Sequence, residues 1–130
     1  MLKGSCCCGA IQFQLNNLPT MMGTCHCSRC RKLGSSTLIF VQKNDFILLQ
    51  GQEFIEKFQP EPPFHYTRSF CKKCGTALGE IGSTNDSFPI PANCLDDHLP
   101  LNIQFHVHVA SKPHWYEICD SAPQFLENPN

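Results

Sequence analysis

The sequence predicts an all-β fold of short antiparallel strands with little helix, and three observations favour this class. Apolar and polar residues alternate over several short segments, which is typical of half-buried strands. Turn-forming Gly, Pro and Asn residues separate these segments. Cysteines gather in three tight groups, which offers cross-links to a core built from short strands. With 130 residues, we expect residues 1–130 to form a single domain.

The clearest strand prediction is the segment 10–15. It places Ile11, Phe13 and Leu15 on one face and glutamines on the other, as expected when one face of a strand is buried. The other expected strands cover residues 21–25, 37–42, 64–70, 77–81, 88–92, 101–110 and 115–118. Two prolines limit 88–92 to the edge of a sheet, because proline cannot donate to a ladder of hydrogen bonds.

One helical turn and one hairpin complete the expected elements. Residues 28–33 can form the turn, with Ser28 as its N-cap and Gly34 at its end. Residues 45–50 and 53–58 resemble the two arms of a hairpin that turns near Gly51.

Charge and composition exclude two classes of partner. A net charge of −1 gives no basic surface for a nucleic acid, whose phosphates require one. No apolar run approaches the about 20 residues needed to span a bilayer, so we expect no membrane partner. The N-terminus lacks the apolar segment of a signal peptide, which predicts a cytoplasmic protein. Homodimerisation is compatible with the sequence.

Ten cysteines in a reducing compartment favour metal binding over disulfides, which remain the alternative. Cys25, Cys27 and Cys30 lie within six residues, a density that an ordinary core does not require. Zinc prefers thiolate ligands about 2.3 Å away in a tetrahedral shell. The cluster therefore predicts a zinc site.

A second zinc site is expected to combine the two other cysteine groups. Cys6 and Cys8 can face one metal ion while Cys7 points away, because successive side chains on a strand alternate. Cys71 and Cys74 precede Gly75, which can adopt the left-handed backbone of a zinc knuckle. These four thiols would form a closed four-sulfur site.

The remaining three thiols would leave one zinc position free for water or substrate, as in catalytic zinc sites. In the rival arrangement Cys7, His26 or a distant histidine supplies a fourth ligand, and both sites are structural. The sequence leaves both arrangements open.

Three stretches carry a resemblance to a known family: residues 4–10, 25–31 and 68–76, read in order at these spacings. Here the chain resembles the glutathione-dependent formaldehyde-activating enzymes, a family that includes centromere protein V. The resemblance implies a Mss4-like β-tent fold, and one departure is Cys7 in place of an expected histidine.

The resemblance also implies a zinc-dependent carbon–sulfur lyase. Glutathione and a small aldehyde, formaldehyde in the family, would combine to S-hydroxymethylglutathione. Two zinc ions are implied, one structural and one catalytic. The structural ion would be bound by Cys6, Cys8, Cys71 and Cys74, and the catalytic one by Cys25, Cys27 and Cys30.

Several further residues are candidates for the same site. The basic residues Arg29, Arg31 and Lys32 can meet the carboxylates of a glutathione-like substrate, or form a solvated turn. His106 and His108 share one face of an expected strand. They can act as proton carriers, or they can lie on a solvent-exposed face of the sheet without a functional role. The aromatic residues Trp115, Phe40 and Tyr66 can line a pocket or the core, and Cys94 and Cys119 are expected to be buried.

Two other functions remain open alongside the lyase. The first is a non-catalytic zinc module for protein or chromatin contacts, which would have a filled fourth zinc position or a flat surface. The second is a metal or redox sensor, which would use labile zinc and an oxidisable Cys7.

Overall fold

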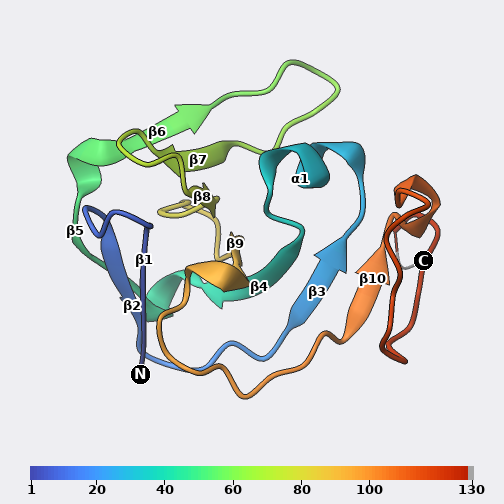
Figure 1. The fold of residues 1–130 in the computed structure, drawn as a ribbon. Helices are drawn as coiled ribbons and strands as arrows, with labels where there is room; N and C mark the ends of the chain where they lie inside the picture. Colours follow the sequence, from blue (N-terminus) through green and yellow to red (C-terminus); the bar gives the residue numbers. More distant parts are fainter. Residues whose placement is uncertain (129–130) are drawn as a thin grey trace.

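The computed structural model describes residues 1–128, and short strands dominate it (Figure 1). Ten strands form three small sheets, and these residues contain one α-helix, so the expected fold class is confirmed and agrees with a Mss4-like all-β fold. Within residues 1–128, no helix has the length and apolar character needed to cross a membrane.

The central sheet has four strands in the order β10-β3-β4-β9, and three-stranded sheets have the orders β1-β2-β5 and β6-β7-β8. The strands are β1 (Leu2–Ser5), β2 (Gln12–Leu15), β3 (Met22–Cys25), β4 (Thr37–Gln42), β5 (Phe46–Gln50), β6 (Ile55–Phe58), β7 (Arg68–Cys71), β8 (Ala77–Gly79), β9 (Ser87–Pro91) and β10 (Phe105–Val107). The helix is α1 (Ser28–Leu33), and four 3₁₀ turns are η1 (Lys43–Asp45), η2 (Gln52–Phe54), η3 (Ala92–Cys94) and η4 (Val109–Ser111).

The core lies between the sheets and is built from the apolar faces of the strands. Phe13, on the predicted face of β2, is fully buried and stacks on Phe46 with ring centroids 5.5 Å apart. Phe46 in turn meets the buried Phe88 of β9 edge-on. Cys6 and Cys71 belong to the same apolar cluster, so the core directly supports one group of thiols.

Helix α1 ends as expected but begins differently. Gly34 follows it in the left-handed conformation, with φ of 72°. Its N-cap is Cys27, and the prediction of Ser28 is wrong. The sulfur of Cys27 accepts a hydrogen bond from the backbone N–H of Cys30 at 3.3 Å, so the cap is itself one of the clustered thiols.

The expected hairpin around Gly51 is wrong. Strand β5 pairs with β2, whereas β6 pairs with β7 in a different sheet. Gly51, with φ of 94°, is the corner between the two sheets, and a Cβ there would lie 2.3 Å from the carbonyl oxygen of Ala10. The chain thus needs glycine because another backbone passes close to it.

The C-terminal part departs most from the expectation. The strand predicted over 101–110 is reduced to β10, which ends before His108, a residue with φ of 54°. Strand β10 also pairs with β3 in parallel, with His106 opposite Thr24. The strand expected over 115–118 is wrong: Lys112 donates to the carbonyl oxygens of Pro113 and Tyr116 and closes a turn instead.

Candidate zinc sites and the adjoining cavity

The first group of thiols comes from two distant parts of the chain. Cys6, Cys8, Cys71 and Cys74 bring their Sγ atoms within 4.8 Å of one another. The Sγ atoms of Cys6 and Cys8 are 3.6 Å apart, and those of Cys8 and Cys71 are 3.9 Å apart. Sulfurs in a tetrahedral zinc shell lie about 3.8 Å apart, so this group fits a zinc ion.

The turn after β7 provides hydrogen bonds to this four-sulfur cluster. Gly75 has φ of 80°, the left-handed backbone expected of a knuckle. The Thr76 hydroxyl lies 3.1 Å from the sulfur of Cys74, and hydrogen bonds from Thr76 lower the pKa of Cys74 to about 5. The backbone N–H of Cys7 donates to the same hydroxyl, while the Cys7 side chain is exposed.

The second group, the three-sulfur cluster, is Cys25, Cys27 and Cys30, whose Sγ atoms also lie within 4.8 Å of one another. Cys25 ends β3, Cys27 caps α1 and Cys30 lies in its first turn. Among residues 1–128, no histidine, aspartate, glutamate or further cysteine joins this cluster. The donor set therefore fits zinc with one position left for another ligand.

Arg68 lies against this three-sulfur cluster. Its two terminal guanidinium nitrogens are 3.7 and 3.8 Å from the Sγ of Cys30. A hydrogen bond from Cys25 and the charge of Arg68 lower the pKa of Cys30 to about 5, although burial opposes the shift. The same hydrogen bond and burial raise the pKa of Cys25. A cation thus lies beside the buried sulfur of Cys30, the kind of partner that a buried thiolate requires.

His26 lies between two of the clustered thiols but points elsewhere. Its Nε2 is 2.9 Å from Nδ1 of His106, and both rings are buried. His106 in turn contacts the carboxylate of Asp120, with its Nε2 at 3.0 and 3.1 Å from the two oxygens. Burial is the largest cause that lowers the pKa of His26, and the nearby Lys112 acts in the same direction. His26 is therefore part of a histidine pair and does not complete the three-sulfur cluster.

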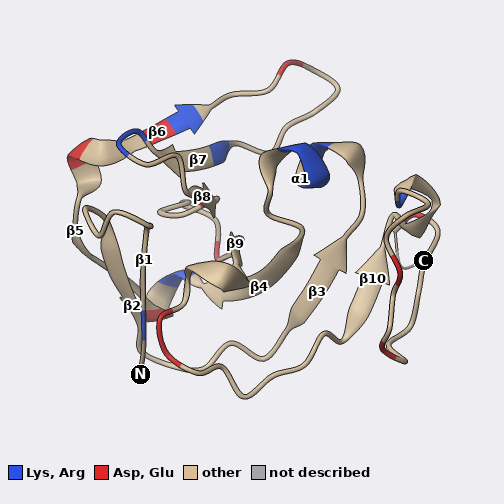
Figure 2. Cartoon of the chain, viewed as in Figure 1, with Lys and Arg blue, Asp and Glu red and all other residues tan. Residues whose placement is uncertain are grey.

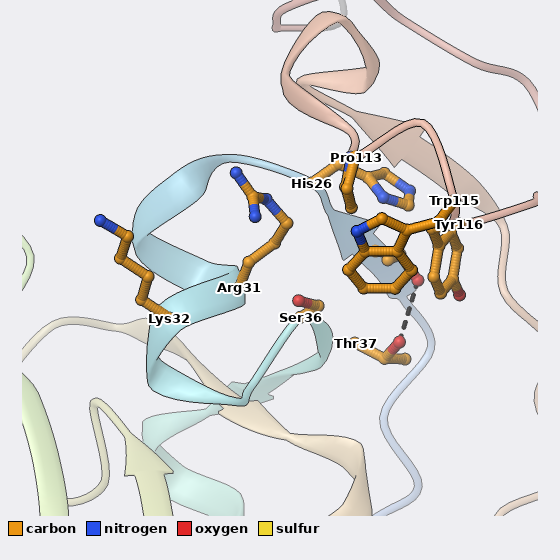
Figure 3. Close-up of a pocket in the computed structure, with 9 residues that line it drawn as sticks. His26, Arg31, Lys32, Ser36, Thr37, Pro113, Trp115 and Tyr116 are labelled. Atoms are coloured by element: carbon orange, nitrogen blue, oxygen red, sulfur yellow. Dashed lines mark hydrogen bonds between the residues drawn. The ribbon is translucent and has the colours of Figure 1, made fainter.

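A cavity of about 380 Å³ lies beside α1 (Figure 3), and its lining includes Thr24, His26 and Arg31, the chain neighbours of Cys25 and Cys30, but none of the three cysteines. Arg31 and Lys32 extend from α1 on one side, and Trp115 and Tyr116 stand on the other. The cavity is also lined by Thr24, His26, Ser36, Thr37 and Pro113. Its volume lies within the about 300 to 1,000 Å³ typical of small-molecule sites.

The predicted basic residues separate into two groups. Arg31 and Lys32 lie in the last turn of α1, where Figure 2 shows basic positions, and both line the cavity. Arg29 instead places its guanidinium 3.8 Å from the ring centroid of Phe64, a cation–π contact. The cavity wall is thus basic and aromatic, which suits an anionic ligand with an apolar part.

Other sequence candidates are placed outside the site. His108 follows β10 and does not share a strand face with His106, whose buried side chain also excludes a wet face. Of the aromatic candidates, Trp115 lines the cavity and Phe40 and Tyr66 do not. Cys94 is buried as expected, but Cys119 is exposed, so that prediction is wrong. All ten cysteines are free thiols.

The sequence reasoning missed Asp120, Tyr116 and the contact of Arg68 with Cys30. Of these three, only Arg68 could have been identified from sequence, because it lies three residues before Cys71 of the knuckle and on the same strand, β7. Nothing in the local pattern around Asp120 indicated that it would reach His106.

Three comparisons place the chain among known proteins. Residues 1–111 match the family described as glutathione-dependent formaldehyde-activating enzyme. A search of curated proteins finds no match. Among solved structures, a Rhodobacter sphaeroides protein determined as a structural genomics target is similar, with a TM-score of 0.61 and 24% identity over 75% of this chain and 91% of that one. At this identity the likeness establishes the fold alone.

Proposed function

The chain belongs to the glutathione-dependent formaldehyde-activating enzyme family, and from this premise we propose that it is a zinc-dependent carbon–sulfur lyase acting on thiol adducts of small aldehydes. The observation that carries the proposal is the three-sulfur cluster together with a cavity that has a basic and aromatic wall and is lined by the chain neighbours of Cys25 and Cys30. A flat surface or a fourth protein ligand would have favoured a non-catalytic zinc module. Zinc-thiolate chemistry and a small-molecule cavity together favour the enzyme.

Two zinc ions have separate roles in this proposal. The four-sulfur cluster would hold a structural ion, because its ligands fill the shell and two of them lie in the core. Cys25, Cys27 and Cys30 would hold the catalytic ion, which when bound supplies a position that stabilises a substrate thiol as thiolate.

The residues of the cavity orient the two reactants. Arg31 and Lys32 bind the carboxylates of a glutathione-like thiol, and Trp115 covers its apolar part. The thiol sulfur then bonds to the aldehyde carbon, and the carbonyl π electrons move to oxygen, which takes up the proton released by the thiol. In the reverse direction the carbon–sulfur bond breaks, and the hydroxyl proton passes to the departing sulfur.

The proposal also covers the compartment, the partners and the oligomeric state of the protein. Residues 1–130 would act as one domain in the cytoplasm, where reducing conditions keep its thiols free. The partners would be a small thiol such as glutathione and a small aldehyde, and a homodimer is compatible with a reaction carried out within each chain.

The activity itself can be measured directly. NMR with ¹³C-labelled formaldehyde and glutathione follows the adduct carbon, and exchange between free aldehyde and adduct gives the rate. We expect the zinc-loaded protein to accelerate this exchange in proportion to its concentration. A rate equal to that of the protein-free mixture, at full zinc content, would contradict the lyase.

Arg31→Glu should raise KM for glutathione by about three- to tenfold and leave kcat nearly unchanged. The change reverses the charge of a residue at an exposed site, where charge-assisted contacts contribute up to about 1 kcal/mol. Initial rates over a range of glutathione concentration measure both constants. Lys57→Glu makes a similar charge reversal at an exposed residue outside the cavity and is the control. An unchanged KM in Arg31→Glu would show that the basic wall does not bind substrate.

Arg68→Met should weaken zinc binding at the three-sulfur cluster by about 10- to 100-fold, the usual effect of losing a group that supports a metal ligand. Three thiolates around one zinc ion leave a net negative charge, which Arg68 balances through Cys30. Competition with a colorimetric chelator measures the affinity, and Arg31→Met is the control. Equal affinities in Arg68→Met and the unmodified protein would contradict this role.

A further inference from the structure

A series of hydrogen bonds links the exposed Asp120 of the C-terminal segment, through two buried histidines, to the cavity wall. It runs from the carboxylate of Asp120 through His106 to His26, with contacts of 3.0, 3.1 and 2.9 Å. The two imidazole rings are also stacked, with centroids 5.1 Å apart and planes inclined by 26°. Asp120 lies beyond residues 1–111, the part of the chain that matches the family.

Several backbone contacts hold this series in place. The backbone N–H of His26 donates to the carbonyl of Val107 at 3.0 Å, which joins the end of β3 to β10. The backbone of His106 is held on the other edge of β10. Its backbone N–H donates to the carbonyl of Pro123, and its carbonyl accepts from the backbone N–H of Phe125. Asp120 accepts a further hydrogen bond from the N–H of Ala122 at 3.0 Å. The two histidines therefore extend from hydrogen-bonded backbone, and the Asp120 carboxylate is held by the N–H of Ala122.

The direction of the hydrogen bonds follows from the acceptor at one end. An ionised carboxylate only accepts, and hydrogen bonds from Ala122 and His106 lower the pKa of Asp120. Nε2 of His106 therefore carries a proton. In a neutral imidazole the other nitrogen accepts, so Nδ1 of His106 accepts from Nε2 of His26. Nδ1 of His26 is then left as an acceptor.

That acceptor is available to a ligand. The His26 ring lines the cavity, and Tyr116 packs edge-on against it with centroids 5.5 Å apart. Nδ1 of His26 makes no hydrogen bond with another of residues 1–128. Among the same residues the only fully enclosed side-chain nitrogen or oxygen without a partner is Nε of Arg68, so Nδ1 of His26 is not sealed in the interior.

We propose that His106 and Asp120 are positioning residues that present Nδ1 of His26 as a hydrogen-bond acceptor for the hydroxyl group of a hemithioacetal in the cavity. The part that concerns the ligand rests on the proposed function. A hemithioacetal carries a hydroxyl on the carbon bonded to sulfur, whereas a thioether carries none. His26 thereby distinguishes the aldehyde adduct from an alkylated thiol of the same size.

The hydrogen-bond series is tested on the zinc-loaded protein by NMR of ¹⁵N-histidine, with His26 assigned from His26→Gln. We expect Nε2 of His26 to be protonated and Nδ1 unprotonated. Asp120→Ala should mix the two tautomers of His106 and shift both nitrogens of His26. Asp86→Ala removes an exposed carboxylate elsewhere and should shift neither. A proton on Nδ1 of His26, or nitrogen shifts that Asp120→Ala leaves unchanged, would overturn the proposal.

The ligand is tested with two probes that differ in the hydroxyl group. An equilibrated mixture of glutathione and formaldehyde should shift Nδ1 of His26 in the direction of a hydrogen-bonded nitrogen, and S-methylglutathione should not. The indole resonance of Trp115 should respond to both probes, because this side chain lines the cavity. A response of Trp115 without any hydroxyl-dependent shift at His26 overturns the inference and leaves the proposed function intact. No response of Trp115 to either probe overturns both.

Kinetics separate positioning from a merely structural role. Asp120→Ala should lower kcat for the adduct by about 10- to 100-fold, with a smaller change in KM and full zinc content. Asp120→Asn keeps an oxygen that accepts from His106 and should recover part of kcat. Equal kcat in Asp120→Ala and the unmodified protein would contradict the positioning role.

Discussion

Cys71→Ser leaves the chain largely unfolded at 25 °C, by our expectation, even when zinc is present. Cys71 is fully buried at the end of β7, and its sulfur lies 3.9 Å from that of Cys8. Apparent binding free energies of structural zinc are about 10–16 kcal/mol. A domain of this kind has a total stability of only about 5–15 kcal/mol, so loss of one ligand removes most of it.

Circular dichroism and the dispersion of amide resonances measure this loss of structure. Cys7→Ser is the matched control, because Cys7 lies between two proposed ligands but its side chain is exposed. It should fold and keep its full zinc content, since its contact with Thr76 uses the backbone N–H. A folded Cys71→Ser protein with unchanged stability would show that the four-sulfur cluster is not a structural metal site.

The second large effect is expected at the three-sulfur cluster. Cys27→Ser should fold normally, lose one zinc ion per chain and lose turnover by more than about 100-fold, the upper end of the effect of losing a supporting residue. Serine is a favoured N-cap, so α1 keeps a hydrogen bond to the N–H of Cys30 while the thiolate ligand is removed. The loss of activity can then be assigned to the missing sulfur.

Two controls make this result specific. Cys27→Ala removes the cap as well and should cost about 1 kcal/mol more in the free energy of unfolding, measured by denaturant titration. Cys119→Ser changes an exposed thiol outside both clusters and should leave turnover unchanged. Full turnover in Cys27→Ser would refute a catalytic role for this cluster.

The three-sulfur cluster, the knuckle turn of the four-sulfur cluster and the all-β class follow from local sequence, for physical reasons. Ligand spacing within a few residues restricts the geometry, and a glycine after a knuckle needs a positive φ, as Gly75 has. Strand alternation likewise identified Ile11, Phe13 and Leu15 as core residues, and all three are fully buried. These features depend on residues that are close together in the chain.

Apart from the union of Cys6 and Cys8 with Cys71 and Cys74, where the shared metal chemistry was the signal, features that depend on distant pairing were not predictable. The parallel contact between β3 and β10 joins segments about 80 residues apart, and it places His106 beside His26. The turn that Lys112 closes after η4 then brings Tyr116 to the cavity and leads to Asp120. Gly51 was misinterpreted for the same reason, since its turn connects two sheets and does not join neighbouring strands.

Native mass spectrometry of the protein purified without chelators tests the central claim most directly, because it counts the metal ions on each folded chain. We predict two zinc ions per chain, with one lost in Cys27→Ser and the other retained as long as the chain stays folded. A compact, folded chain that carries no zinc would contradict the claim that the two thiol clusters bind zinc.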